Sequence, residues 1–441
     1  MSDFIKCNAD LHMHGLYSRA VSKDMVPNII AEQAPLKGLN LVASADILHL
    51  GWQKLFKEQL KKTADEAIFE YSNGTKFILG TELECSNRVH HLVYFPSMSK
   101  VDELRERLKG KCKDFEADGR QKLWVNSEEL AGLCRDVGAL IGFAHAFTPY
   151  FGLFGKFDSY KKCYGKYAKD IKFMELGLSA DTNMADRISE LHDLTFLSNS
   201  DGHSPWPNKL GREFNELRIK EITFDEIKKA LFREGRRKCT LNVGFNPLEG
   251  KYHKTRCTGC LKFFDPKDGV KFKWRCPECK KPIKKGVDYR IEELSDVPVN
   301  VHPDHRPDYK HIMPLSEIIA LAIDKKNVYS DKVQDIWKKF IAKFGNEIRV
   351  LFRAPYEELQ QVDENIANYI IYFREEQIQY IPGGAGQYGK LVKPGEKIEL
   401  DVFNPKQKSL VDFYIALMDY YGLFYFILFF YSLISFKFNN K

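Results

Sequence analysis

Two pairs of metal-binding side chains, nearly two hundred residues apart, constrain this chain more than any other feature. His12 and His14 are separated by one residue, and Asp201 and His203 have the same spacing. On a β-strand, side chains two residues apart point to the same face. Each pair is therefore predicted to direct two ligands to one site, and together the pairs indicate one multinuclear metal site built from the first and last strands of a barrel.

Further His, Asp and Glu residues between the two pairs follow short apolar runs. Residues 77–80 precede Glu82, and residues 139–144 precede His145. Such runs, separated by helical stretches, are typical of parallel strands buried on both faces. In barrels of this kind the active site lies at the carboxyl ends of the strands. The candidate ligands of the series are Asp46, His49, Glu82, His90, His91, His145 and Glu175. Imidazole and carboxylate ligands together suit Zn²⁺, Mn²⁺ or Fe²⁺ better than Mg²⁺ or Ca²⁺ alone.

The order of these motifs resembles that of the polymerase and histidinol phosphatase (PHP) family. The matching motifs are His12-x-His14, Asp46, Gly80-x-Glu82, His90-His91, Ala144-His145 and Ser200-Asp201-x-His203. The resemblance implies a distorted β/α barrel with a phosphoesterase site that holds two or three divalent metals (Zn²⁺, Mn²⁺ or Mg²⁺). The implied ligands are His12, His14, Glu82, His91, His145, Asp201 and His203.

Two ligand positions remain open between alternatives. His90 is an alternative to His91. The family has Asp directly followed by His in its second motif, whereas Asp46 and His49 are three residues apart here. Either of these two residues is therefore a candidate ligand.

Four cysteines predict a second, structural metal site. Cys257-x2-Cys260 and Cys276-x2-Cys279 have the spacing of a zinc ribbon, in which four thiolates close the coordination shell of one Zn²⁺. The other six cysteines (Cys7, Cys85, Cys112, Cys134, Cys163, Cys239) show no paired spacing. With no signal peptide at Met1-Ser2-Asp3, we expect a reducing, cytoplasmic setting.

Positive charge is concentrated on the ribbon. Residues 251–290 hold thirteen Lys/Arg and four Asp/Glu, a net of +9, whereas the whole chain carries +7. Aromatic residues such as Phe272 and Trp274 lie among the cations, and this combination can hold phosphates and stack bases. The predicted nucleic-acid contacts are Lys271, Lys273, Arg275, Lys280, Lys281, Lys284 and Lys285. A small scaffold with a solvated basic face is the alternative.

The C-terminal half narrows the resemblance to the archaeal endonuclease Q family. It has the loop His302-Pro-Asp-His-Arg-Pro307, helical patterns at 314–323, 330–344 and 356–372, and a Gly-rich loop at 383–389. Residues 18–23 and 175–181 match as well, so the resemblance covers residues 1 to about 413. It implies a DNA-repair nuclease that cuts 5′ to deaminated bases (hypoxanthine, uracil, xanthine) and abasic sites.

The predicted organisation is an α/β chain in four parts. A PHP-type barrel (1–245) is followed by the ribbon (250–292), a mostly helical DNA- and lesion-binding region (293–400) and a tail (401–441). We expect catalytic roles for Asp201 and His203, with Arg19 or Lys23 gripping a phosphate oxygen. Gly384, Gly386 and Tyr388 are expected in a lesion pocket. A histidinol-phosphatase-like small-molecule phosphoesterase and a non-enzymatic DNA- and clamp-binding adaptor are the alternative functions.

The tail carries a candidate partner motif. Gln407, Leu410, Phe413 and Tyr414 fit the Q-x-x-L-x-x-F-Y peptide that binds the sliding clamp, PCNA. Residues 420–436 form an uncharged run of seventeen, at the short limit for a membrane span. We interpret this run as an atypical extension in preference to a membrane anchor.

Overall fold

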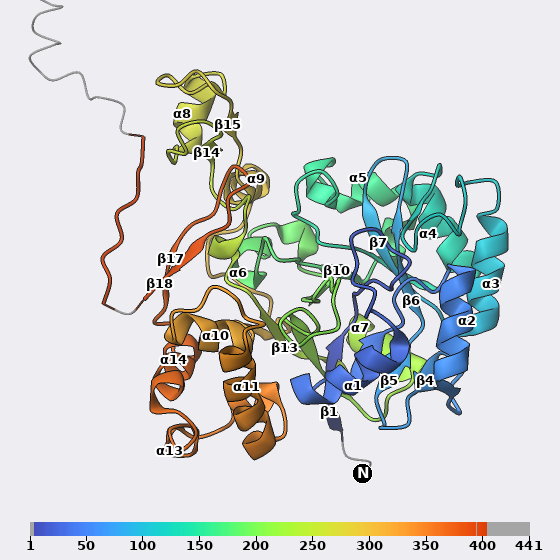
Figure 1. Ribbon diagram of the computed structural model, residues 1–441. Coiled ribbons are helices and arrows are strands. Elements are labelled where there is room, and N and C mark those ends of the chain that lie inside the picture. The colour runs from blue at the N-terminus through green and yellow to red at the C-terminus, as the bar shows by residue number, and fades with distance from the viewer. Residues whose placement is uncertain (1–3, 394, 404–441) are drawn as a thin grey trace, which may run out of the picture.

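The computed structural model describes residues 4–393 and 395–403 (Figure 1). The predicted clamp peptide and the apolar run at 420–436 lie outside the described residues. Within the described part of the chain, no helix has the length and apolar character needed to cross a membrane.

Two sheets form the barrel. The order of the first is β16 (Asp308–His311), β13 (Lys238–Gly244), β12 (Phe214–Ile219), β1 (Ile5–Asp10), β2 (Leu41–Ala43), β5 (Lys76–Ile78), β4 (Ile68–Glu70) and β3 (Lys61–Lys62). The order of the second is β11 (Thr195–Leu197), β10 (Phe173–Glu175), β9 (Leu140–Phe143), β7 (His90–Tyr94), β6 (Gly80–Glu84) and β8 (Gln121–Lys122).

The strands are not all parallel, in contrast to the prediction. β9, β10 and β11 run parallel, but β7 is antiparallel to both β6 and β9. The turn at residues 85–89 joins β6 directly to β7, and so short a connection permits only antiparallel pairing. The predicted α/β barrel of the PHP type is confirmed, with this hairpin built into it.

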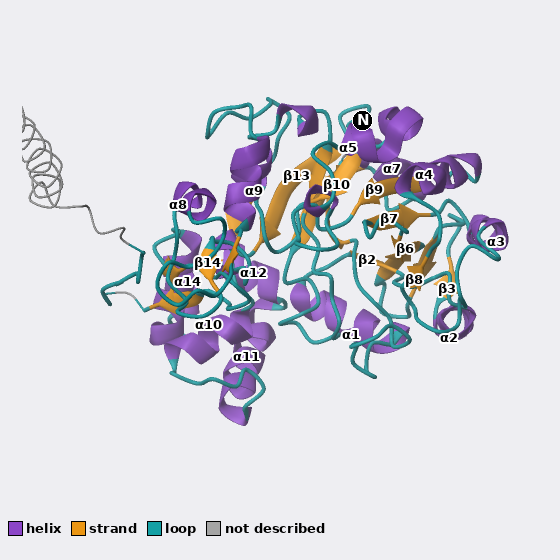
Figure 2. Ribbon diagram, turned by 90° about the horizontal axis from the view of Figure 1, so that it is seen from above, coloured by secondary structure: helices purple, strands orange, loops and turns teal. Residues whose placement is uncertain are grey.

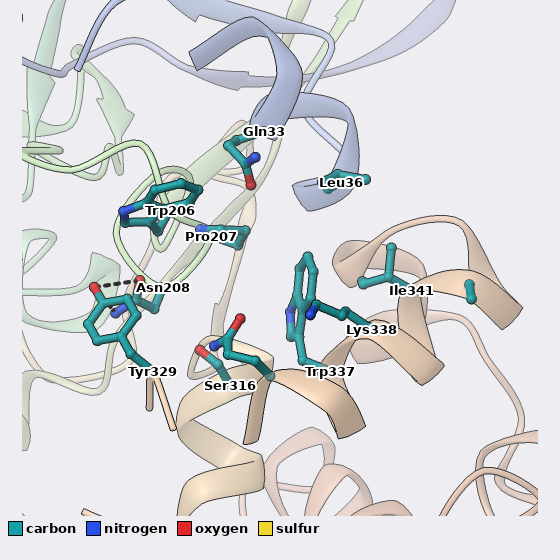
Figure 3. Close-up of a pocket in the computed structure, with 12 residues that line it drawn as sticks. Gln33, Leu36, Trp206, Pro207, Asn208, Ser316, Tyr329, Trp337, Lys338 and Ile341 are labelled. Atoms are coloured by element: carbon teal, nitrogen blue, oxygen red, sulfur yellow. Dashed lines mark hydrogen bonds between the residues drawn. The ribbon is translucent and has the colours of Figure 1, made fainter. Parts of the chain in front are cut away.

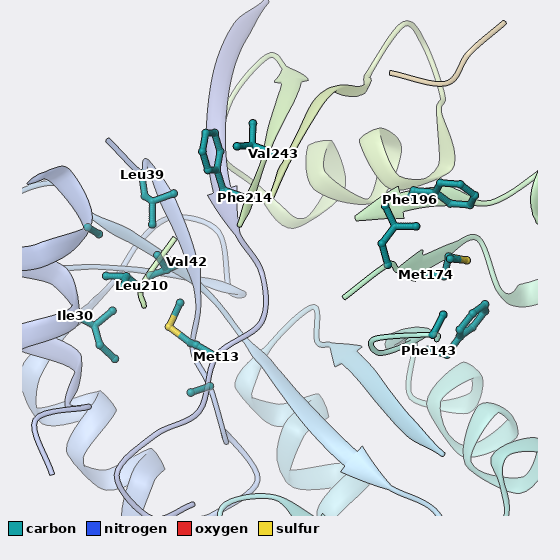
Figure 4. Close-up of a cluster of buried hydrophobic side chains, with 14 of the residues drawn as sticks. Met13, Ile30, Leu39, Val42, Phe143, Met174, Phe196, Leu210, Phe214 and Val243 are labelled. Carbon is teal, nitrogen blue, oxygen red and sulfur yellow. The ribbon is translucent and has the colours of Figure 1, made fainter. Parts of the chain in front are cut away.

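Helices cover the outside of the barrel, as Figure 2 shows from above. They are α1 (Pro27–Lys37), α2 (Leu50–Gln59), α3 (Met98–Arg107), α4 (Ser127–Asp136), α5 (Tyr160–Tyr164), α6 (Thr182–Ala185) and α7 (Phe224–Phe232). Their starts follow capping chemistry: Asn126 accepts a hydrogen bond from the backbone N–H of Glu129 at the start of α4. Apolar side chains of strands and covering helices meet in one buried cluster, among them Met13, Val42 and Phe214 (Figure 4), and a second cluster includes Ala9, Leu92 and Leu217.

A small module leaves the barrel between two neighbouring strands. The chain passes from β13 through β14 (Arg256–Cys257), α8 (Pro266–Lys271), β15 (Ile283–Lys284) and α9 (Val287–Leu294), then returns as β16. β16 pairs in parallel with β13, so the barrel sheet includes residues beyond the predicted 1–245 segment. The module stands away from the barrel in Figure 1, where its strands carry the labels β14 and β15.

The remaining described residues are mostly helical, as predicted. They form α10 (Leu315–Ala322), α11 (Asp331–Phe344), α12 (Glu347–Phe352), α13 (Tyr356–Leu359), α14 (Glu364–Arg374) and the hairpin β17 (Gln379–Ile381) and β18 (Lys390–Val392). The pattern at 356–372 predicts one helix, but Asp363 caps a new helix by accepting from the N–H of Ile366. The buried face of α11 has helical spacing, and each side chain fully buried there contributes roughly 1.5–3 kcal/mol.

Candidate metal centre

Seven side chains converge where strands of the barrel end. His12 and His14 follow β1, Glu82 and His90 lie on the β6–β7 hairpin, His145 follows β9, and Asp201 and His203 follow β11. The first five are buried, and Asp201 and His203 are half-buried. The cluster therefore has a closed interior and one side open to a substrate.

His14 and Glu82 join the cluster into one site. Each belongs to two groups of three residues whose ligand atoms lie within 4.8 Å of one another. Nε2 of His14 lies 3.3 Å from Oδ1 of Asp201 and 3.4 Å from Oε2 of Glu82. Oε1 of Glu82 lies 2.8 Å from Nδ1 of His90 and 2.9 Å from Nε2 of His145. Three overlapping groups of this kind are the arrangement of a multinuclear centre.

Several buried ligand atoms of the cluster have no hydrogen-bond partner among the described residues. They are Nε2 of His12, His14 and His90, Nδ1 of His145, and Oδ1 of Asp201. A buried polar atom without a partner costs free energy, so a group of them at one point requires an explanation. Imidazole nitrogens and carboxylate oxygens are the ligands that divalent transition metals take, and the residues therefore fit such ions.

The electrostatics of the cluster favour cations. Burial opposes protonation of His12, but the surrounding carboxylates, Glu175 first, outweigh it and raise the pKa of His12 to about 9. Burial likewise opposes ionisation of Glu82, yet His90 and its neighbours hold the pKa of that carboxyl well below its usual range. The site thus carries a negative field, and a metal that binds there displaces protons from the imidazoles.

Two carboxylates behind the cluster orient its first two histidines. Glu175 lies 3.0 Å from Nδ1 of His12, and Asp46 lies 3.1 Å from Nδ1 of His14. Carboxylates in this position fix the tautomer of a ligating imidazole and turn its Nε2 toward the metal. The structure places Asp46 against His14, outside the groups of atoms that could hold a metal ion.

His49, the alternative to Asp46, also lies outside the ligand set. It caps α2: its Nδ1 accepts from the backbone N–H of Trp52, and its Nε2 lies 3.2 Å from the carbonyl oxygen of Glu116. Its ring stacks on Tyr17, with the ring centroids 4.2 Å apart. Both nitrogens are thus used in local contacts, and His49 does not belong to the groups of atoms that could hold a metal ion.

His90 occupies the position expected for His91. Adjacent residues on a strand point to opposite faces, and on β7 it is His90 that faces Glu82. Both nitrogens of His91 are engaged behind the strand, with the hydroxyls of Tyr164 at 2.7 Å and Ser127 at 2.9 Å. Burial lowers the pKa of His91 to about 3, so this histidine is a neutral core residue.

A cation at the cluster comes from a residue that the sequence patterns did not indicate. Nη1 of Arg120 lies 3.4 Å from Oε2 of Glu82. Arg120 lies beside Gly119, where a Cβ would come within 2.5 Å of Asp46, so the chain approaches the site closely there. The predicted phosphate-gripping residues Arg19 and Lys23 are exposed. No strand end or motif marks Arg120, which explains why sequence reasoning missed it.

The four ribbon cysteines come together as predicted. Sγ of Cys257 lies 3.3 Å from Sγ of Cys279, and Sγ of Cys260 lies 3.7 Å from Sγ of Cys276. All four fall in one group that can hold a metal ion. Four thiolates without an open position fit a structural Zn²⁺. The predicted nucleic-acid contacts, Lys271, Lys273, Arg275, Lys280, Lys281, Lys284 and Lys285, are all exposed on this module.

The Gly-rich loop packs against the start of the ribbon module. A Cβ at Gly384 would lie 2.6 Å from the carbonyl oxygen of Lys254, and the N–H of Gly386 donates to Lys251. Gly384 therefore permits close packing of two backbone segments. Tyr388 lines a cavity of about 400 Å³, opposite Arg212.

The loop at 302–307 is structural. The guanidinium of Arg306 is 2% exposed, forms an ion pair with Asp186 at 2.7 Å and lies 3.3 Å from the ring centroid of Phe196. Nδ1 of His302 binds the same Asp186 at 2.8 Å. These contacts dock the loop beneath β11, away from the cluster at the strand ends.

An α/β barrel whose strand ends carry a buried histidine and carboxylate cluster defines a metal-dependent phosphoesterase of the PHP type. A family model described as the MJ0043 C-terminal domain matches residues 314–377. The protein MJ0043 of Methanocaldococcus jannaschii is 45% identical over 260 residues, which are 58% of this chain and 32% of MJ0043. The chain thus spans about a third of that relative. YqxK of Bacillus subtilis is 33% identical over 411 residues, 88% of this chain and 100% of YqxK.

Two solved structures are similar throughout. The lesion-specific endonuclease PfuEndoQ of Pyrococcus furiosus is 45% identical with a TM-score of 0.85, over 90% of this chain and 98% of that chain. The second is endonuclease Q in complex with a 27-mer duplex substrate that has an abasic lesion at the active site. It is 45% identical with a TM-score of 0.83, over 90% of this chain and 99% of that chain. This chain belongs to the endonuclease Q family.

Proposed function

We propose that the protein is a DNA-repair endonuclease that hydrolyses the phosphodiester 5′ to a damaged nucleotide, at abasic sites and at the deaminated bases hypoxanthine, uracil and xanthine. The observation that carries the proposal is the convergence of unpartnered ligand atoms at the strand ends beside Arg120. The similarity to an endonuclease bound to a duplex with an abasic lesion supports the choice of substrate.

In this proposal His12, His14, Glu82, His90, His145, Asp201 and His203 hold two or three divalent ions, Zn²⁺, Mn²⁺ or Mg²⁺. Such ions supply a water of lowered pKa and neutralise charge in the transition state. Asp46 and Glu175 keep the imidazoles of His14 and His12 in the ligating tautomer. The guanidinium of Arg120 is placed to bind a non-bridging phosphate oxygen once Glu82 is engaged by metal.

The ribbon provides the polyanion-binding surface in this proposal. Lys284 and Lys285 line a cavity of about 470 Å³ with Trp274, and Tyr150 from the barrel forms part of its other wall. A cavity with cations and aromatic rings on facing walls suits a nucleic-acid strand. Replacing Lys280, Lys281, Lys284 and Lys285 with Ala is expected to weaken DNA binding and to reduce its salt dependence. If the affinity for DNA and its dependence on salt are both unchanged in this variant, these lysines do not bind DNA.

The damaged base enters the cavity lined by Tyr388 and Arg212. Arg212 links this cavity to the candidate metal centre, because its Nε donates to the carbonyl oxygen of Ser200, next to Asp201. Extrusion costs least at a weak mispair or an abasic site, which gives a first level of selectivity. Tyr388 is 68% exposed, so Tyr388→Ala is expected to keep the fold and to lower lesion cutting.

The sliding clamp remains the proposed protein partner, through Gln407, Leu410, Phe413 and Tyr414. The chain that leads to this peptide is anchored on the ribbon. Phe403 stacks on Phe264 with the ring centroids 4.6 Å apart, and its N–H donates to Phe263.

One assay tests the proposal. The protein is incubated with Mg²⁺ or Mn²⁺ and a duplex that carries a single abasic site or deoxyinosine, alongside phosphorylated amino alcohols. A nick 5′ to the lesion is expected, and it should disappear in Asp201→Asn while the fold is kept. Release of inorganic phosphate without a nick would instead identify a small-molecule phosphoesterase.

A further inference from the structure

A cavity of about 630 Å³ lies between the barrel and the C-terminal helices, separate from the two cavities described above. Figure 3 shows its walls: α1 on one side, the loop at residues 206–208 on another, and helices α10 and α11 opposite. Its volume falls within the roughly 300–1,000 Å³ of pockets that bind small molecules.

The walls suit a flat ligand. Trp206, Trp337 and Tyr329 all line the cavity, and aromatic side chains bind planar rings by stacking. Indole and phenol faces contribute to such a site mainly by contact area, so they do not require the ligand to be charged. An inorganic anion would make no use of them.

A residue that lines the cavity, Ser316, carries an unused polar group at its wall. The hydroxyl of Ser316 is buried, with the residue 4% exposed, and among the described residues its Oγ has no hydrogen-bond partner. Ser316 lies between Asn208 and Trp337 in Figure 3. A purely apolar ligand, such as an acyl chain, would leave this hydroxyl unpaired. The ligand that fits this site best is therefore a planar ring that has hydrogen-bonding atoms on its edge.

The cavity is fixed before any ligand enters. The carbonyl oxygen of Pro207 accepts from Nζ of Lys37 at 3.0 Å, and the amide of Asn208 donates to the hydroxyl of Tyr329 at 3.0 Å. The Nε1–H of Trp337 donates to Glu347 at 2.9 Å. The loop at residues 206–208 follows His203 after only two intervening residues, so the cavity and the candidate metal centre are connected by a short stretch of chain.

We propose that this cavity is a second nucleobase site, distinct from the lesion cavity at Tyr388. The occupant is a base extruded from the duplex or the base of a free nucleoside, since both present the same planar, polar-edged ring. The first source rests on the proposed function: extrusion of a lesion leaves a base without its partner, and stacking of that base on Trp206 would offset the cost.

The test uses the full-length chain with Asp201→Asn, which keeps the substrate intact. 5-Iodouracil is placed opposite an abasic site and at each flanking position, and the cross-linked peptide is identified by mass spectrometry. In parallel, free deoxynucleosides and mononucleotides are titrated by equilibrium dialysis. Cross-links to Trp206, Tyr329 or Trp337 are expected for at least one DNA position.

Matched variants separate binding from folding. Ser316→Ala is expected to weaken base binding about fivefold, the loss that corresponds to one hydrogen bond of roughly 1 kcal/mol. Ser330→Ala is the control, because its Oγ is also buried without a described partner but does not line the cavity. Ala342→Phe, which fills the rim, should abolish binding, and Lys339→Phe on the same helix should not.

The outcomes are distinct. Cross-links to the cavity support a base from DNA, and saturable nucleoside binding that Ser316→Ala weakens supports a free nucleoside. Neither signal, or binding that survives both Ser316→Ala and Ala342→Phe, would overturn the proposal. The nicking assay is read separately, so a protein that nicks lesions without binding a base here disproves only this site.

Discussion

Oδ1 of Asp46 lies 3.1 Å from Nδ1 of His14, and this contact turns the other nitrogen of His14 toward Glu82 and Asp201. Asp46 is itself fixed, because its second oxygen accepts from the N–H of Gly15 and the hydroxyl of Ser18. In the proposed metal site Asp46 would therefore act one step behind the metal, on the tautomer and orientation of His14.

Asp46→Asn is therefore expected to reduce the affinity of the barrel for divalent metal by about 10–100-fold, because an amide cannot hold the imidazole as a carboxylate does. Calorimetric titration of Mn²⁺ into the metal-depleted protein measures this. His49→Gln should leave the metal affinity unchanged, since His49 caps α2. Equal affinities for Asp46→Asn and the wild type would contradict the assignment.

Substitutions of His90 and of His91 should have different effects, the first on metal binding and the second on the stability of the fold. His90→Ala is expected to lower the metal content of the barrel, measured by mass spectrometry of bound metals. His91→Ala should keep that content but lower the free energy of unfolding by about 1–3 kcal/mol, because it leaves the buried hydroxyl of Tyr164 without its partner. Loss of metal in His91→Ala, with the metal kept in His90→Ala, would instead identify His91 as the ligand.

The buried ion pair between Lys37 and Glu347 should behave differently from a surface pair. Its atoms lie 2.5 Å apart, with the side chains 2% and 0% exposed. Lys37→Met is expected to lower the free energy of unfolding, measured in urea, by about 3–5 kcal/mol, because it leaves the buried carboxylate of Glu347 without its counter-ion. Adding Glu347→Gln should recover part of this loss, since it removes the unpaired charge but keeps an acceptor for only one of the two N–H donors, Leu315 and Trp337. Lys62→Met, which breaks an exposed pair, should cost less than about 1 kcal/mol.

Stability should depend on pH through Glu213. Burial raises the pKa of Glu213 from 4.5 to about 8, so the folded protein retains a proton that the unfolded chain releases. The stabilisation is complete below pH 4.5 and is lost as the pH rises through 8, with a slope of up to about 1.4 kcal/mol per pH unit. Glu213→Gln should flatten the profile of unfolding free energy between these values. A profile identical to that of the wild type would mean that Glu213 is ionised in the fold.

The sequence alone predicts most of the metal centre, since strand alternation and strand-end position are local properties. His12, His14, Glu82, His145, Asp201 and His203 all reach the cluster on these grounds. Alternation also requires that only one of His90 and His91 faces the site. Which one it is depends on the register of β7 against β6, where Glu84 lies opposite His90, and that pairing is a tertiary property.

Other features depend on contacts that leave no local pattern. Arg120 reaches Glu82 from a loop, and its position depends on the close approach of Gly119 to Asp46. β16 is short and mostly polar, so only its pairing with β13 makes it part of the barrel sheet. The glycines at 383–389 suggest space for a ligand, but three of them (Gly383, Gly384 and Gly389) instead admit a neighbouring backbone.

The position of the ribbon between β13 and β16 has a consequence for how it searches for DNA. A module on a single linker sweeps a volume that grows with the length of that linker. The ribbon is attached at both ends to adjacent strands of one sheet, so its accessible volume is small. Once either module contacts DNA, the effective concentration of the other at the same strand is high. In the proposed complex two individually weak contacts would act as a bivalent grip, and dissociation would require both to be released together.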